Sequence, residues 1–479
     1  MTPSNELFEL IKSLNKTEKR YIKLNFSPNE DAKYRMLFDE IDKQGTYDEN
    51  KIKEKFKSEK FIKQLTFTKH YLYNIILNLL ISYNRANSTE TQMTELVIKL
   101  RILFRKGLFV QYFKTLLKYK AKAAEYEKHY ILIELIRMQR LVMEARKFRS
   151  ANSADIYAEE KDILQKIENI GEYSKLFNKA MALKRKSGIT GKQTASKAAG
   201  ELLNNELLRN IKLAYSTQAK EYFYHIKQQL YAIKGDKNNQ YKSCIKRLKC
   251  IENNPKPFLD DIINTRREAL FTLADLSIDR KNGEHKIFLE KYFSSKQGKK
   301  IKSALISNFI ELKYHVNIND FSIDKVCFEL EDDLKRYRGK LDKDMEIEAM
   351  FLISKYYFYK TEFSAALKKN NDILSLPTAK FRKDIYNYYR ILEIMIHFEL
   401  ENYVQVEYLV DSLRKLLGKE KELNYNELNQ IDLIGKILPP RNIDRTSLLK
   451  AIQSEKSAEG NNSQYLDTLS WINSKISKL

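Results

Sequence analysis

The stretch that decides the fold is residues 344–377, DMEIEAMFLISKYYFYKTEFSAALKKNNDILSLP. Its first half places Met350, Ile353 and Tyr357 at the spacing of one face of a helix. A short polar turn, Lys360-Thr361-Glu362, follows, and Pro377 ends the stretch. Between the turn and this proline, apolar residues return at helical spacing at Phe363, Ala366, Leu367 and Ile373. The stretch therefore predicts two antiparallel helices joined by a very short turn.

Composition extends this prediction to the whole chain. The 479 residues include only 13 Gly and 7 Pro, where ordinary usage would give roughly 34 and roughly 24. A hydrophobic fraction of 43% supplies a packed interior. A single core stops growing below this chain length, so the helices are expected to stack rather than to form one globule. We predict an all-α fold, an irregular α-solenoid of antiparallel helix hairpins with an N-terminal helical module.

The pair at 344–377 resembles the tetratricopeptide repeat. Tyr357 stands where that family has its first-helix Tyr, Phe363 where the second helix opens with an aromatic residue, and Ala366 where a small residue permits close packing. Three weaker copies contain, in turn, Leu103, Gly107, Phe109 and Leu116; Tyr224, Tyr231, Gly235, Tyr241 and Ile245; and His397, Tyr403 and Leu413. The Trp-Leu-Gly portion of the family is missing, so we expect irregular repeats over about residues 91–435. The whole chain resembles helical-repeat proteins of the Bacteroidota, and this likeness implies no activity.

Three parts are predicted along the chain. Residues 1–90 form a basic N-terminal helical module, residues 91–437 the tetratricopeptide-like repeats, and residues 438–479 capping helices that contain the single Trp471. Two basic stretches, 184–200 and 294–300, collect Gly or Ser beside Lys and are predicted to be exposed loops.

The charge of the chain indicates one class of partner. Lys and Arg outnumber Asp and Glu by 86 to 63, which gives a net charge of +23. Such residues gain affinity for phosphates by releasing counterions, although an AT-rich genome would raise Lys without any selection for binding. Residues 48–81 are compatible with a helix-turn-helix element whose second helix lies in a major groove. The candidate contacts for nucleic acid or an acidic partner are Lys51, Lys53, Lys55, Lys57, Lys60, Lys63, Lys69, Lys184, Arg185, Lys186, Lys192, Lys299, Lys300 and Lys302.

Metal and redox chemistry find little support in the sequence. Four histidines follow a glutamate by four residues, in the pairs Glu125/His129, Glu221/His225, Glu311/His315 and Glu393/His397. Each pair could supply two metal ligands, but no single repeat supplies the rest, so ion pairs within a helix are the favoured interpretation. Cys244, Cys250 and Cys327 form no closely spaced pair, which indicates neither a disulfide framework nor a zinc site. We expect no metal and no cofactor.

These observations lead to one expected function and one alternative. No nucleophile elbow or dinucleotide-binding turn is recognisable, so we expect no enzyme and no small-molecule substrate. No export signal or membrane span is predicted, and the thiols favour a cytoplasmic location. We expect a non-catalytic scaffold or adaptor that binds protein partners along its solenoid. The alternative is an RNA- or DNA-associated factor, ribosome-linked or regulatory, that uses a basic surface.

Overall fold

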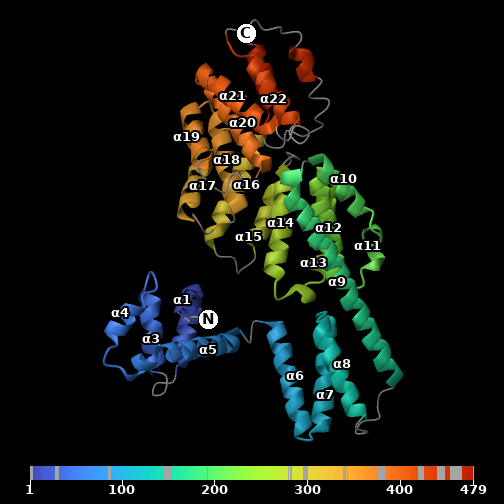
Figure 1. The fold of residues 1–479 in the computed structure, drawn as a ribbon. Helices are drawn as coiled ribbons and strands as arrows, with labels where there is room; N and C mark the ends of the chain where they lie inside the picture. Colours follow the sequence, from blue (N-terminus) through green and yellow to red (C-terminus); the bar gives the residue numbers. More distant parts are fainter. Residues whose placement is uncertain are drawn as a thin grey trace. The chain divides into compact units, whose positions relative to one another are not determined.

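The computed structural model describes residues 4–26, 32–84, 88–144, 153–190, 192–278, 280, 283–294, 300–337, 341, 343–374, 383–418, 425–439, 448–453 and 466–477. Within these ranges every regular element is a helix, which confirms the all-α prediction (Figure 1). None of these helices has the length and apolar character that crossing a bilayer requires. The chain divides into two compact units, Met1–Ile163 and Leu164–Leu479. The boundaries predicted at residues 90 and 437 stay predictions.

The first unit begins with five α-helices around one core. They are α1 (Ser4–Ser13), α2 (Lys16–Asn25), α3 (Ala32–Lys43), α4 (Glu49–Lys55) and α5 (Leu65–Asn84), with a short 3-10 helix, η1 (Lys60–Gln64), before α5. Asn15 and Glu18 form a capping box at the start of α2, and the Asp48 side chain caps α4 as its sequence predicts. Three further helices, α6 (Thr89–Arg105), α7 (Phe109–Glu125) and α8 (His129–Glu144), pack on one another.

The second unit is a series of helices packed in adjacent pairs. Its helices are α9 (Ser153–Thr190, which begins before the unit boundary), α10 (Lys192–Leu203), α11 (Glu206–Arg209), α12 (Thr217–Lys234), α13 (Lys237–Asn253), α14 (Ile262–Ile278), α15 (Glu284–Phe293), α16 (Lys300–Asn317), α17 (Asp324–Arg336), α18 (Lys343–Tyr359), α19 (Phe363–Leu374), α20 (Lys383–Glu399), α21 (Tyr403–Gly418), α22 (Tyr425–Lys436) and α24 (Thr468–Ile476). Short 3-10 helices, η2 (Ile211–Leu213) and η3 (Lys256–Phe258), stand between them. The pairs α12/α13, α14/α15, α16/α17, α18/α19 and α20/α21 have the close contacts of hairpins. Since α14, α16, α18, α20 and α22 also contact one another in series, they form a common layer.

One turn geometry closes the four predicted hairpins. Gly107, Gly235, Thr361 and Glu401 each have a positive φ, of 71°, 72°, 66° and 60°. The N–H of the residue after each donates to the carbonyl five residues earlier, as in Asp236 N to Tyr231 O, 2.9 Å, which is a Schellman motif. The same turn occurs at Glu127 and Asn319, where the sequence analysis placed no hairpin.

Aromatic pairs brace three of these turns. The ring centroids lie 5.6 Å apart for Phe104 and Phe109, 5.7 Å for Phe358 and Phe363, and 5.5 Å for Phe398 and Tyr403. In each case the first ring ends one helix and the second opens the next. These contacts fix the angle at which the two helices meet.

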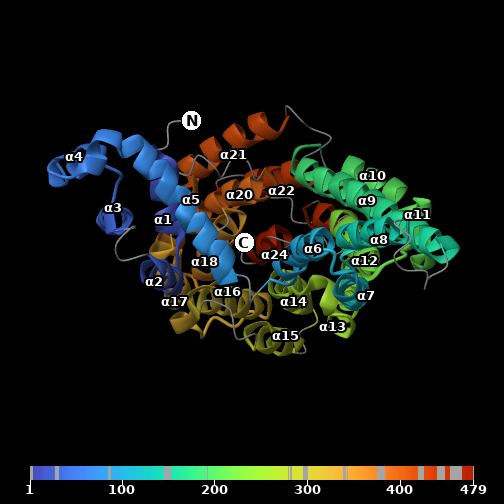
Figure 2. The same ribbon diagram turned by 90° about the horizontal axis from the view of Figure 1, so that it is seen from below.

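The last described helix packs against the common layer of the second unit. In Figure 2 α24 lies near α22, which it contacts. Trp471 Nε1–H donates to Glu399 Oε1 at 2.6 Å, and Lys475 Nζ lies 2.6 Å from Glu399 Oε2. The indole stands edge-on to Phe398 with ring centroids 5.3 Å apart. These contacts tie α24 to the end of α20.

The predicted loop at 184–200 is wrong. Helix α9 continues to Thr190 and α10 begins at Lys192, so the described part of this stretch is helical. Ala195 and Ala199 are fully buried, and packing of this alanine face outweighs the cost of about 1 kcal/mol for each helical glycine. Of the other predicted loop, residues 295–299 lie outside the described residues, and Lys300 already belongs to α16.

Candidate polyanion-binding face

Four of the seven predicted lysines of the first unit form ion pairs with acids of the same unit. Lys53 pairs with Glu49 at 2.8 Å, Lys51 approaches Asp48 at 3.8 Å, and Lys55 pairs with Glu40. Within the described residues Lys57, Lys60 and Lys63 are exposed and form no ion pair. The number of lysines in residues 51–69 is therefore larger than the number that remain unpaired in the structure.

The prediction that Lys69 is a surface contact is wrong. Its side chain is buried, with 2% of the residue exposed, and its ammonium lies 2.5 Å from Glu49 Oε2 and 3.2 Å from the hydroxyl of Tyr47. The pKa of Glu49 falls to about 2 because Lys53 and Lys69 both hydrogen-bond to it. Lys69 thus fixes α5 to the start of α4 and is not a surface contact.

The remaining predicted contacts belong to the second unit. Lys184 and Arg185 are exposed on α9, and Lys184 Nζ donates to Gln229 Oε1 at 2.8 Å. The side chains of Lys186, Lys192, Lys300 and Lys302, and all of Lys299, lie outside the described part of the chain. Of the predicted contacts of the second unit, the described side chains are those of Lys184 and Arg185.

The excess charge lies elsewhere in the sequence. Residues 164–300 contain 28 Lys and Arg against 14 Asp and Glu, while residues 301–479 contain 27 of each. The positive part of the second unit is therefore α9–α15, with α12 and α13 at its centre.

A stripe of alternating Lys and Tyr runs along α12. Lys220, Tyr224, Lys227, Tyr231 and Lys234 follow one another at spacings of four and three residues, so they share one face of the helix. Lys220 and Lys234 are exposed and the other three are half-buried. Most residues between them are buried, including Phe223, Ile226 and Leu230, which pack in the core. The stripe is therefore the solvent face of α12.

Two neighbouring elements add positive charge to this stripe. Burial lowers the pKa of Lys227, and the nearby charge of Lys246 on α13 lowers it further. Arg209, the last residue of α11, lines the same groove as Lys227 and Lys234. We call these residues the basic face: Arg209, Lys220, Tyr224, Lys227, Tyr231, Lys234 and Lys246.

The cations of the basic face have no carboxylate partners in the described residues. The contact of Lys227 is with a ring, since its ammonium lies 4.7 Å from the centroid of Phe223. Asp236 lies in the groove, but its Oδ1 accepts from Asn239 N at 3.0 Å and caps α13. Mutual repulsion of Lys227 and Lys246 is therefore unrelieved within this unit, and an anion would relieve it.

A groove in the first unit provides a comparison. It measures about 520 Å³ and lies between α2 and α3, lined by Lys16, Lys19, Arg20, Lys23, Arg35 and Asp42, among others. Here Lys19 lies 2.5 Å from Asp42 and Lys23 lies 2.6 Å from Asp39, so part of the charge is already neutralised. Lys16, Arg20 and Arg35 of this groove form no ion pair among the described residues, so it is a second, partly neutralised basic surface.

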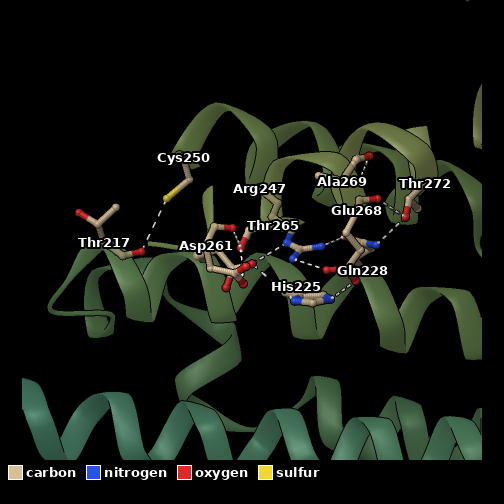
Figure 3. Close-up of polar contacts among 12 residues, drawn as sticks. Thr217, His225, Gln228, Arg247, Cys250, Asp261, Thr265, Glu268, Ala269 and Thr272 are labelled. Atoms are coloured by element: carbon tan, nitrogen blue, oxygen red, sulfur yellow. Dashed lines mark hydrogen bonds and ion pairs between the residues drawn. The ribbon is translucent and has the colours of Figure 1, made fainter. Parts of the chain in front are cut away.

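A buried polar cluster fixes the two helices that carry the basic face. Arg247 of α13 is 1% exposed, and its Nε lies 2.6 Å from Glu221 Oε1 of α12 (Figure 3). Its Nη2 lies 3.0 Å from Glu268 Oε2 of α14. The ring of His225 stands between the two acids, with Nδ1 3.5 Å from Glu221 and Nε2 3.2 Å from Glu268.

The pKa values of the two acids show that this cluster is ionised. Burial alone would raise the pKa of Glu221, but the hydrogen bond to His225 and the charge of Arg247 outweigh burial and lower it. The same balance lowers the pKa of Glu268 to about 2. The cluster is thus a charged clamp that joins α12, α13 and α14.

Two of the four predicted Glu–His pairs approach one another within their helices. Besides Glu221 and His225, Glu311 and His315 approach within 3.9 Å, while Glu393 pairs with Arg390 at 2.9 Å instead. Among the residues that the structure describes, no group of three or more His, Cys, Asp or Glu side chains is arranged to hold a metal ion.

Comparison with known proteins adds no further guide to this function. No protein-family model, curated protein or solved structure matches the chain. The tetratricopeptide-like interpretation rests on the residues of this chain alone.

Proposed function

We propose that the protein is a non-catalytic helical-repeat adaptor that binds nucleic acid through the basic face of α11–α13. The observation that carries this proposal is the Lys220/Lys227/Lys234 stripe, whose ammonium groups have no acidic partner in the described residues. Lysines seven residues apart on a helix recur about every 10.5 Å, and a polyanionic backbone can follow such a row. The proposal favours nucleic acid over the protein partners expected first from the sequence.

The rigidity of the face supports binding rather than incidental charge. Its helices are held by the Arg247 clamp and by the Schellman turn at Gly235, so the lysine stems start from fixed positions. A preformed surface loses less conformational entropy on binding than a mobile tail does. By contrast, Lys53 and Lys55 of the first unit pair with acids.

A salt titration with charge-matched variants tests the proposal. One variant changes Lys220, Lys227 and Lys234 to Gln, and its control changes the unpaired Lys57, Lys60 and Lys63 of the first unit to Gln. Both lose three charges. Binding to mixed cellular RNA and to duplex DNA is followed by fluorescence anisotropy from about 50 to about 200 mM salt.

We expect the α12 variant to flatten the plot of log K against log salt by about 2 to 3, since each phosphate contact contributes about 0.7 to 0.9. The control should change the slope by less than about 1. If both variants lowered the salt slope equally, only the net charge of the protein would matter, and the basic face would be refuted as the site. Absence of binding by the wild-type protein at about 50 mM salt would refute the proposed function itself.

A further inference from the structure

The basic face contains a groove between α10, α11 and α12. It has a volume of about 550 Å³ and opens to solvent; its lining includes Asn204, Arg209, Lys227, Tyr231 and Lys234. Gly200 of α10 forms part of its wall, and the ammonium of Lys234 would lie only 3.9 Å from a Cβ atom at that position. Lys234 therefore reaches across the groove to α10.

The groove presents three kinds of group that have no partner in the described residues. Arg209 and Lys234 are exposed cations without an ion pair. Asn204 offers a carboxamide with no hydrogen bond from its side chain to the protein. Tyr231 has neither a ring contact nor a hydrogen bond from its hydroxyl. Positive charge, an amide and an aromatic ring thus meet in one place.

Tyr231 differs in this respect from the other aromatic residues of α12. Tyr222 packs on Phe177 with ring centroids 5.6 Å apart, and Phe223 and Tyr224 form an edge-on pair at 5.2 Å. Tyr231 has no ring partner among the described residues and lines the groove instead. The half-buried Tyr231 is thus the aromatic side chain of α12 that faces the groove without another ring against it.

This combination selects one form of nucleic acid. A duplex keeps the faces of its bases covered by stacking, so that only phosphates, sugars and base edges are open to contact. A single strand exposes bases that can stack on an aromatic ring while its phosphates contact Lys and Arg. An amide beside the ring can hydrogen-bond to the edge of a base placed there.

We propose that the groove binds one unpaired nucleotide of a single-stranded nucleic acid, with its base on Tyr231, its edge near Asn204 and the flanking phosphates on Arg209 and Lys234. This inference rests on the proposed function, because it names the form of nucleic acid that the basic face accepts. The stripe of α12 then extends the strand beyond the groove toward Lys220.

The test compares a labelled mixed-sequence single strand, a duplex of the same length and labelled heparin at one salt concentration. Tyr231→Leu keeps an apolar side chain but removes the ring. Tyr224→Leu is the matched control, since Tyr224 shares the stripe but does not line the groove. Far-UV circular dichroism establishes that both variants remain folded.

We expect the wild-type protein to prefer the single strand to the duplex by at least tenfold. Tyr231→Leu should raise the Kd for the single strand about 5- to 150-fold, the worth of one stacked base, without changing the salt slope. Heparin binding should be unchanged in that variant, and Tyr224→Leu should have a smaller effect on the single strand.

The failures of the two proposals are distinguishable. Equal affinity for single strand and duplex, or a Tyr231→Leu variant that binds like the wild type, would overturn the groove assignment and leave polyanion binding by the basic face intact. Failure of the wild-type protein to bind the single strand, the duplex and heparin would overturn both.

Discussion

Replacing Arg247 with Met should remove the charge that holds α12, α13 and α14 together. The guanidinium is 1% exposed and contacts carboxylates of Glu221 and Glu268 at 2.6 and 3.0 Å. Removing one partner of a buried ion pair costs about 3 to 5 kcal/mol, because the remaining charge is left without compensation. The Glu268 side chain is 50% exposed and keeps water, so Glu221 accounts for most of the loss and about 3 kcal/mol is expected at pH 7.

The pH dependence of this loss can be derived from the two acids. In the wild-type protein both folded pKa values lie below the ordinary 4.5, that of Glu268 at about 2. The acids therefore stabilise the fold above pH 4.5, and this contribution is lost as the pH falls toward about 2. Without Arg247, burial raises the pKa of Glu221 above 4.5. The free energy of unfolding of the variant then falls as the pH rises from 4.5 to that raised pKa. The difference between variant and wild type should shrink from pH 7 to pH 4.5.

Urea unfolding followed by far-UV circular dichroism at 25 °C measures both effects. At an m-value of about 2 kcal/mol/M, the midpoint at pH 7 should fall by about 1.5 M. The double variant Arg247→Met, Glu221→Leu is the control, and it should recover more than half of the loss because no buried charge remains unpaired. A loss below about 1 kcal/mol, or a double variant no more stable than the single one, would refute the charged-clamp interpretation.

Three other outcomes are expected. Thr361 has a φ of 66°, so Thr361→Gly should raise the free energy of unfolding by about 0.5 to 1 kcal/mol, whereas Gly235→Ala, at φ 72°, should lower it by about 1 to 2 kcal/mol; urea titration checks both signs. Trp471→Phe removes the indole donor to Glu399, and amide exchange in α24 should accelerate about 5- to 30-fold, while an unchanged rate would contradict the role given to that bond. Burial, with the charge of Lys313, lowers the pKa of Lys355 to about 8, so the unfolded chain binds the proton more tightly between pH 8 and 10.5 and stability rises across that window. Lys355→Met should therefore be more stable than wild type at pH 7, by a margin that shrinks by pH 10 in urea titrations; an equal margin at both values would contradict this pKa.

The hairpins were predictable where a glycine or a clear apolar pattern marked the turn in the sequence. Gly107 and Gly235 mark their turns directly, and Thr361 is marked by the apolar pattern on both sides of it. Glu127 and Asn319 adopt the same left-handed conformation without glycine, and no repeat pattern was recognised around them in the sequence. At 184–200 the opposite error arose, because the burial of Ala195 and Ala199 against other helices cannot be inferred from local composition.

The candidate site was only partly predictable for a related reason. A scan for lysine density selects residues 51–69, but the acids that pair with Lys55 and Lys69 come from other helices of the fold. The seven-residue recurrence of Lys220, Lys227 and Lys234, with tyrosines between, was present in the sequence and would have indicated α12. That these lysines lack acids nearby is a property of the packed helices and required the structure.

The uneven charge of the second unit has a consequence for how an encounter begins. Residues 164–300 carry twice as many basic as acidic residues, and residues 301–479 carry equal numbers. Such a separation gives the unit a permanent electric dipole, and the field of a polyanion exerts a torque on it before any contact forms. The unit should therefore rotate its α12 end toward the partner during diffusion, which raises the fraction of collisions that are productive. At physiological ionic strength this alignment acts only over the last approach, about 8 Å, and in dilute buffer it reaches several times farther.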